Sequence, residues 1–216
     1  MTPLRVGPDI FVFDSALPPG VCQSIVEAVK HSDKWRHAEV VHGSRANGDP
    51  QRTRELLSTR SYLRNCMIST LSQHPQLEAA IGTVRDTVKS ITTWWDHNVC
   101  EVPPGWSIEE PYVVRYEVGQ QFARHTDIRR IHKGHNRLFT VLFYLNESLG
   151  GDLQFPDHGL TITNKPGRAV MFPSGDTYPH ASNMVVGGTK YSIPVWVHYP
   201  DHHPYYHLKR RDTHAC

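Results

Sequence analysis

With 216 residues, the chain has room for one globular domain with a sizeable core, and nothing in its composition marks off a second domain. Its 23 Lys and Arg against 21 Asp and Glu give a formal net charge of only +2, which argues against a general nucleic-acid or membrane-surface partner. No stretch is long and apolar enough to span a bilayer, and residues 1–20 lack the pattern of a secretion signal, so we expect a soluble cytoplasmic protein.

We expect a single domain over residues 1–216, with a helix-rich support over about 10–100, a β-rich core over about 110–199 and a polar, His-rich tail over 200–216. Five of the 15 histidines fall in the last nineteen residues, starting at His198, and we assign them to this polar terminus. The cysteines are far apart and form no CxxC pair, which favours reduced structural thiols over disulfides or a zinc site. They are Cys22, Cys66, Cys100 and Cys216.

The first half is predicted to mix short strands with two helices. Residues 10–13 form a short apolar run, and Pro18-Pro19 then offers a fixed-φ start for a helix. A longer helix is predicted over about 76–97, because its apolar residues recur at three- and four-residue intervals and make a stripe that needs a partner surface. Two further segments, 38–41 and 57–63, are predicted to be extended.

The second half is predicted to be mostly strands. Short β-rich runs are separated by Gly, Pro, Asn and Asp, at a density typical of a sandwich or jelly roll. The runs are 112–118, 137–146, 152–155, 160–163, 169–172, 180–186 and 190–198. Both faces of the run 138–145 need cover, so we expect the helices to pack on one face and the hydroxyls of Thr140 and Tyr144 to look into a cavity on the other.

Three side chains in this β-rich half could hold a metal ion. His125 and Asp127 are two positions apart, so they point to the same side of an extended backbone, and His180 follows later in the chain. Two imidazoles and one carboxylate bind iron on one face and leave the opposite coordination positions open, as in non-haem Fe(II) oxygenases. Lys190, ten residues beyond His180, suggests an anionic co-substrate.

The parity of the last hairpin decides whether the lysine reaches the metal. A two-residue turn at Gly187-Gly188 would put Lys190 and His180 on opposite faces of one sheet. We therefore predict a three-residue loop or a glycine bulge, which turns His180, Lys190, Ser192 and Trp196 inward. Pro194 cannot donate to a ladder and is predicted at an edge or a bulge.

In this order, the motifs resemble the 2-oxoglutarate and Fe(II)-dependent dioxygenases, and specifically their prolyl 4-hydroxylase-like branch. The likeness covers roughly residues 10–199. The segments that carry it are 17–22, 52–63, 115–127, 140–146, 150–155, 167–172, His180, Lys190 and Trp196. One departure is Phe122, which stands where many relatives have tyrosine.

The resemblance implies a mostly β fold with flanking α-helices, a double-stranded β-helix or cupin-like jelly roll. It implies that His125, Asp127 and His180 hold Fe(II), and that 2-oxoglutarate and O2 take the open positions. Lys190 would pair with the distal carboxylate of 2-oxoglutarate, assisted by Tyr144 and Tyr116. We add Thr140 and Ser192 to this predicted pocket, and ascorbate is a candidate auxiliary reductant.

The function implied is hydroxylation of an unactivated C–H bond, coupled to oxidative decarboxylation of 2-oxoglutarate, with proline in a peptide or protein as the first candidate substrate. A free amino acid or small metabolite is the alternative. A nucleic-acid demethylase ranks lower, because the related enzymes carry arginines after the last histidine where this chain has Lys190. A non-catalytic metal-binding jelly roll also ranks lower, because no fourth ligand of a structural zinc site is evident. The basic loop 129–135 is either a substrate-steering element or a solvated connection.

Overall fold

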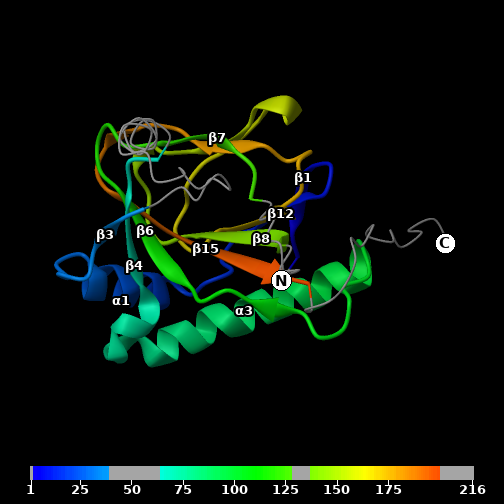
Figure 1. The fold of residues 1–216 in the computed structure, drawn as a ribbon, viewed down its shortest axis with the longest axis horizontal. Helices are drawn as coiled ribbons and strands as arrows, with labels where there is room; N and C mark the ends of the chain where they lie inside the picture. Colours follow the sequence, from blue (N-terminus) through cyan, green and yellow to red (C-terminus); the bar gives the residue numbers. More distant parts are fainter. Residues whose placement is uncertain (1, 39–63, 128–136, 200–216) are drawn as a thin grey trace, which may run out of the picture.

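The computed structural model of the protein describes residues 2–38, 64–127 and 137–199 (Figure 1). The described helices are α1 (Pro19–Val29) and α3 (Glu78–Asn98), with short 3-10 turns η1 (Leu71–Gln73), η2 (Pro75–Leu77) and η3 (Pro156–His158). The described strands are β1 (Leu4–Gly7), β2 (Ile10–Phe13), β3 (Arg36–His37), β4 (Met67–Thr70), β5 (Ser107–Ile108), β6 (Tyr112–Tyr116), β7 (Phe122–His125), β8 (Arg137–Tyr144), β9 (Leu149–Gly150), β10 (Leu153–Phe155), β11 (Leu160–Ile162), β12 (Ala169–Pro173), β13 (His180–Ser182), β14 (Val185–Gly187) and β15 (Lys190–His198).

Two sheets face each other. The larger one has nine strands, in the order β1-β2-β12-β8-β15-β6-β4-β3, and β5 also pairs with β15. The smaller one has four strands in the order β11-β10-β13-β7, and β14 and β9 form a separate pair. Figure 1 shows β7 above the large sheet and both helices below it, so the protein has three layers. This arrangement agrees with the predicted jelly roll.

The helices cover the outer face of the large sheet, as the sequence predicts. The apolar stripe of α3, which includes Val88 and Trp95, shares one buried core with Val141 of β8 and Val195 of β15. Alternate residues along β8 and β15 point to this helical layer, because successive side chains of a strand face opposite ways. Their neighbours, including Tyr144, Lys190 and Trp196, therefore face the small sheet.

The predicted hairpin between the runs 180–186 and 190–198 is wrong. The first run divides into β13, which joins the small sheet, and β14, which pairs with β9, whereas β15 pairs with β8, β6 and β5 in the large sheet. His180 and Lys190 thus belong to different sheets, and no shared ladder sets their relative parity. Lys190, Ser192 and Trp196 do face inward, as predicted. The other set of alternating residues along β15, which includes Ile193 and Val195, packs in the core shared with the helices.

Pro194 lies where one side of β15 has no regular ladder. Pairing with β6 ends at Ser192 and pairing with β5 begins at Val197, so a residue without an amide hydrogen is tolerated between them. This agrees with the predicted edge position.

Several sequence predictions fall outside the described residues. These are most of the extended segments 38–41 and 57–63, the basic loop 129–135 and the tail 200–216. Among the described helices, none is long and apolar enough to cross a membrane. Cys22 and Cys66 are buried free thiols, and Cys100 is buried as well.

His198 ends the predicted strand run 190–198 and does not belong with the histidines of the polar tail. It is the last residue of β15, it is buried, and its Nε2 lies 2.8 Å from Oε1 of Glu109. The large sheet therefore extends through this histidine.

Candidate metal centre

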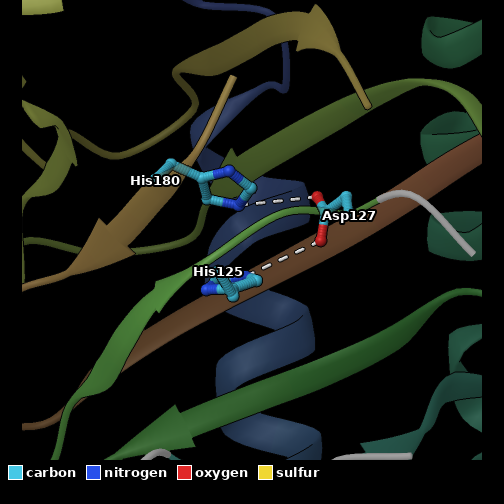
Figure 2. Close-up of side chains that lie close together, drawn as sticks. All are labelled: His125, Asp127 and His180. Atoms are coloured by element: carbon cyan, nitrogen blue, oxygen red, sulfur yellow. Dashed lines mark ion pairs between the residues drawn. The ribbon is translucent and has the colours of Figure 1, made fainter. Parts of the chain in front are cut away.

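Three side chains from two strands of the small sheet converge (Figure 2). His125 ends β7, Asp127 follows two residues later, and His180 begins β13, where the antiparallel register places it directly opposite His125. One oxygen of Asp127 lies 3.7 Å from Nε2 of His125, and the other lies 3.5 Å from Nε2 of His180. One ligand atom from each residue lies within 4.8 Å of the others, which is close enough for all three to bind one ion.

Backbone carbonyls orient both imidazoles. Nδ1 of His125 lies 2.8 Å from the carbonyl oxygen of Ala123, and Nδ1 of His180 lies 3.0 Å from that of Tyr178. A carbonyl can only accept, so each Nδ1 carries the hydrogen and each Nε2 keeps a lone pair for a metal. The ring of Phe122 stacks on His125 with centroids 3.5 Å apart.

Two residues other than the histidines also contact Asp127. The hydroxyl of Thr140 donates to Oδ2 of Asp127 at 2.7 Å and lies 3.0 Å from the hydroxyl of Ser174. Arg137 donates to the backbone carbonyl of Asp127 at 3.2 Å. Thr140, which the sequence predicts in the co-substrate pocket, thus contacts the carboxylate of the candidate metal centre.

Removing the hydroxyl of Thr140 is expected to loosen the carboxylate without changing the shape of the core. Thr140→Val should weaken Co(II) binding roughly 10- to 100-fold, the usual effect of losing a partner that orients a ligand. Titration followed by Co(II) absorption measures this. Ser174→Ala is the matched control, because Ser174 contacts Thr140 rather than Asp127; equal losses in the two variants would contradict the role of Thr140.

The surroundings of His125 and Asp127 lower the pKa of both side chains. Burial lowers the pKa of His125 to about 3, with a further contribution from His180. Burial alone would raise the pKa of Asp127, but His180, His125 and the hydrogen bond from Thr140 lower it to about 2. A metal ion therefore meets little competition from protons at these two residues at neutral pH.

The metal-free protein is expected to lose stability as the pH falls from 6.5 towards about 3, because His125 resists protonation when folded. Its folded pKa lies below its ordinary value, so the unfolded chain binds more protons in this window and acid favours unfolding. Urea unfolding near neutral pH and at about pH 5 measures the change in the free energy of unfolding. His125→Gln should show a weaker pH dependence; an identical dependence would remove His125 as the cause.

Lys190 forms a second, separate feature of the interior. Its side chain is 2% exposed, and its Nζ donates to the carbonyl of Gly151 at 2.5 Å and to the hydroxyl of Ser182 at 2.7 Å. Nζ lies 4.9 Å from the ring centroid of Tyr116 and 5.4 Å from that of Tyr144. Burial lowers the pKa of Lys190 to about 7, and Asp152 opposes this effect.

The polar groups around Lys190 are suited to pair with a carboxylate. The hydroxyl of Tyr144 is buried without a hydrogen-bond partner in the structure, and the ammonium group of Lys190 makes no ion pair with any described carboxylate. A buried donor without a partner is costly, so both groups favour an anion that accepts from them. Ser192 is buried and lies opposite Tyr144 in the ladder, so its side chain is on the same face of the sheet.

Sequence reasoning missed a polar cluster beside Asp127. Arg137 donates to both oxygens of Glu109, each at 2.9 Å, and its guanidinium carbon lies 3.6 Å from the ring centroid of Trp196. His198 completes the cluster through Glu109. Sequence spacing does not connect these residues, because Arg137 lies on β8, His198 lies on β15 and Glu109 directly follows β5.

Comparison with known proteins identifies this region. Residues 111–198 match the model of the 2OG-Fe(II) oxygenase superfamily, and they include all three donor side chains as well as Lys190. This part of the chain is therefore similar to that superfamily. Fe(II) and 2-oxoglutarate are the metal and co-substrate of this oxygenase family, and the donor set and the cationic pocket fit both.

The chain is also similar in sequence to prolyl 4-hydroxylases. It is 35% identical to prolyl 4-hydroxylase subunit alpha-1 of Gallus gallus, with 42% of this chain and 20% of that protein covered. It is 30% identical to prolyl 4-hydroxylase 2 of Arabidopsis thaliana, with 42% of this chain and 41% of that protein covered. The chain thus spans well under half the length of these curated relatives.

Solved structures share the fold of the oxygenase over most of the chain. A Trichoplax adhaerens prolyl hydroxylase in complex with a hypoxia inducible factor peptide matches with a TM-score of 0.65, at 18% identity, over 88% of this chain and 83% of that one. The 2OG complex of a viral collagen prolyl hydroxylase from Paramecium Bursaria Chlorella virus-1 matches with a TM-score of 0.61, at 18% identity, over 89% and 96%. These matches support the predicted jelly roll.

Proposed function

We propose that this protein is an Fe(II)- and 2-oxoglutarate-dependent hydroxylase that acts on proline in a peptide or protein. The observation that carries the proposal is the pairing of an open, three-donor metal centre with a buried lysine in the same interior. We also propose that residues 1–216 act as one domain, because the helices and both sheets share continuous cores.

Each proposed role follows from the position of the residue. His125, Asp127 and His180 would hold Fe(II) through Nε2, a carboxylate oxygen and Nε2. Lys190 would bind the distal carboxylate of 2-oxoglutarate and Tyr144 would donate to it, while Tyr116 and Ser192 would shape the pocket. When bound together, Fe(II), 2-oxoglutarate and O2 supply the oxidising power to hydroxylate an unactivated C–H bond, with release of succinate and CO2.

The protein itself orients the reactants and excludes water. Phe122, Phe155 and Phe172 surround the two imidazoles with apolar surface, with ring centroids 3.5 Å from His125 for Phe122 and 5.7 and 4.7 Å from His180 for the other two. A dry, fixed site of this kind protects a reactive centre from side reactions.

The preference for proline rests on what the relatives are. The curated matches are named prolyl 4-hydroxylases, and the Trichoplax structure contains a peptide. A structural zinc site is less well supported, because the cluster among the described residues has three donors and closed zinc sites have four.

The test is aerobic incubation of the full chain with Fe(II), 2-oxoglutarate and ascorbate, against proline-containing peptides and, separately, free amino acids. Mass spectrometry should show a gain of one oxygen on proline in a peptide, with an equal amount of succinate and loss of both on chelation. Oxygen gained only by free amino acids or small metabolites would assign the alternative substrate class. No succinate under any condition would refute the proposed hydroxylase.

A further inference from the structure

Arg64 is a cation one aromatic ring away from the metal centre. It forms a backbone bridge with Phe122, and its guanidinium carbon lies 4.7 Å from the centroid of the Phe122 ring. That ring stacks on His125 at an interplanar angle of 14°. The guanidinium of Arg64 and the imidazole of His125 therefore both lie against the Phe122 ring.

Arg64 has no carboxylate partner within residues 2–38, 64–127 and 137–199. Its buried Nε lacks a hydrogen-bond partner, and its polar contact is with the phenol of Tyr112. Two other arginines close to the metal centre form ion pairs with carboxylates. Arg137 pairs with Glu109 at 2.9 Å, and Arg124 pairs with Asp157 at 2.7 Å.

The half-buried guanidinium of Arg64 cannot relieve this imbalance by losing its proton, because arginine stays charged in proteins. An uncompensated buried charge is strongly unfavourable, so such a group favours an anion that reaches it. The planar fork of arginine suits a carboxylate especially well. We have already proposed Lys190, whose Nζ donates to Gly151 and Ser182, as the partner of the distal carboxylate of 2-oxoglutarate.

We propose that Arg64 is a specificity-determining residue that binds a carboxylate of the substrate beside the metal centre. The inference rests on the proposed hydroxylase function and deepens it by naming an acidic substrate. The carboxylate has two sources, an acidic side chain next to the target residue of a peptide or the α-carboxylate of a free amino acid.

Matched substrates that differ by one negative charge test the inference. Blocked peptides with Glu or Gln beside the proline, and L-proline with L-prolinamide, are compared in wild type, Arg64→Met, Arg64→Lys and Arg85→Met. Wild type should favour the acidic member of at least one pair roughly 10- to 100-fold in kcat/KM, the range of a charge-assisted hydrogen bond. Arg64→Met should abolish this preference and Arg64→Lys should keep part of it.

Arg85→Met is the matched control, because Arg85 lies on α3 and pairs with Glu110 at the surface. It should keep the full preference. The pair that responds identifies the source of the carboxylate. An unchanged preference in Arg64→Met, or no preference in wild type, would overturn the proposal, as would a raised requirement for 2-oxoglutarate with unchanged discrimination.

A binding measurement separates this inference from the proposed function. Zn(II)-loaded protein saturated with 2-oxoglutarate is heated with each matched compound. The acidic member should raise the Tm of wild type and Arg64→Lys more than its neutral mate, but not that of Arg64→Met. This outcome would support the carboxylate site even if no substrate were hydroxylated. Equal shifts for both members in wild type would refute the site even in an active hydroxylase.

Discussion

Asp127→Ala is expected to abolish hydroxylation and to weaken Fe(II) binding by more than the roughly 10- to 100-fold loss caused by removing a supporting partner. Asp127 is the one anionic donor of the triad, and its two oxygens lie 3.7 and 3.5 Å from the ligand nitrogens of His125 and His180. Without it, two neutral imidazoles remain, which cannot match the charge of the ion. Anaerobic Fe(II) titration and succinate release measure the two effects.

The fold should survive this substitution. Thr140 loses its acceptor but still lies 3.0 Å from the hydroxyl of Ser174, so the change strands no donor. Circular dichroism checks this directly. Asp157→Ala is the control for a nearby carboxylate that pairs with Arg124 at the surface and should bind iron normally. Normal turnover by metal-stripped, iron-reloaded Asp127→Ala would exclude Asp127 as a ligand.

Lys190→Met should raise the 2-oxoglutarate concentration needed for half-maximal activity roughly 10- to 150-fold while leaving Fe(II) affinity nearly unchanged. A hydrogen bond to a charged group contributes about 1.5–3 kcal/mol, which corresponds to that range. Methionine keeps most of the volume of the buried side chain, so packing against Tyr116 and Tyr144 is retained.

Substrate saturation curves and Fe(II) titration separate the two effects. Lys165→Met is the control, because Lys165 is exposed. Equal losses of iron and 2-oxoglutarate binding in Lys190→Met would indicate general damage to the interior, and unchanged 2-oxoglutarate dependence would exclude the pairing.

The convergence of the three side chains at the candidate metal centre could be predicted in part, because two of them lie close together in the sequence. A His-x-Asp on extended backbone fixes two donors on one side, and the motif order supplies the third. The helical cover of the large sheet was predictable for a similar reason, since the stripe on α3 follows from its own periodicity.

The remaining features depend on contacts between segments distant in sequence. The hairpin prediction assumed that adjacent β-rich runs pair with each other, whereas β13 and β15 join different sheets. Thr140 carries no signal that it would bond Asp127 rather than a ligand. Arg64 directly follows the segment 52–63 but lies far from His125 in the sequence, and the two come close because β7 is bridged to residue 64.

The direct pairing of His180 with His125 also has a mechanical consequence for the small sheet. The β7–β13 ladder is irregular, with two paired positions and a register shift between them, so backbone hydrogen bonds alone restrain it weakly. A cation bound by both imidazoles would cross-link β7 and β13, and this cross-link would be lost when the metal is removed. Depleting the metal should therefore speed amide hydrogen exchange in β7 and β13. Exchange in β8 and β12, which pack against the helices, should stay slow.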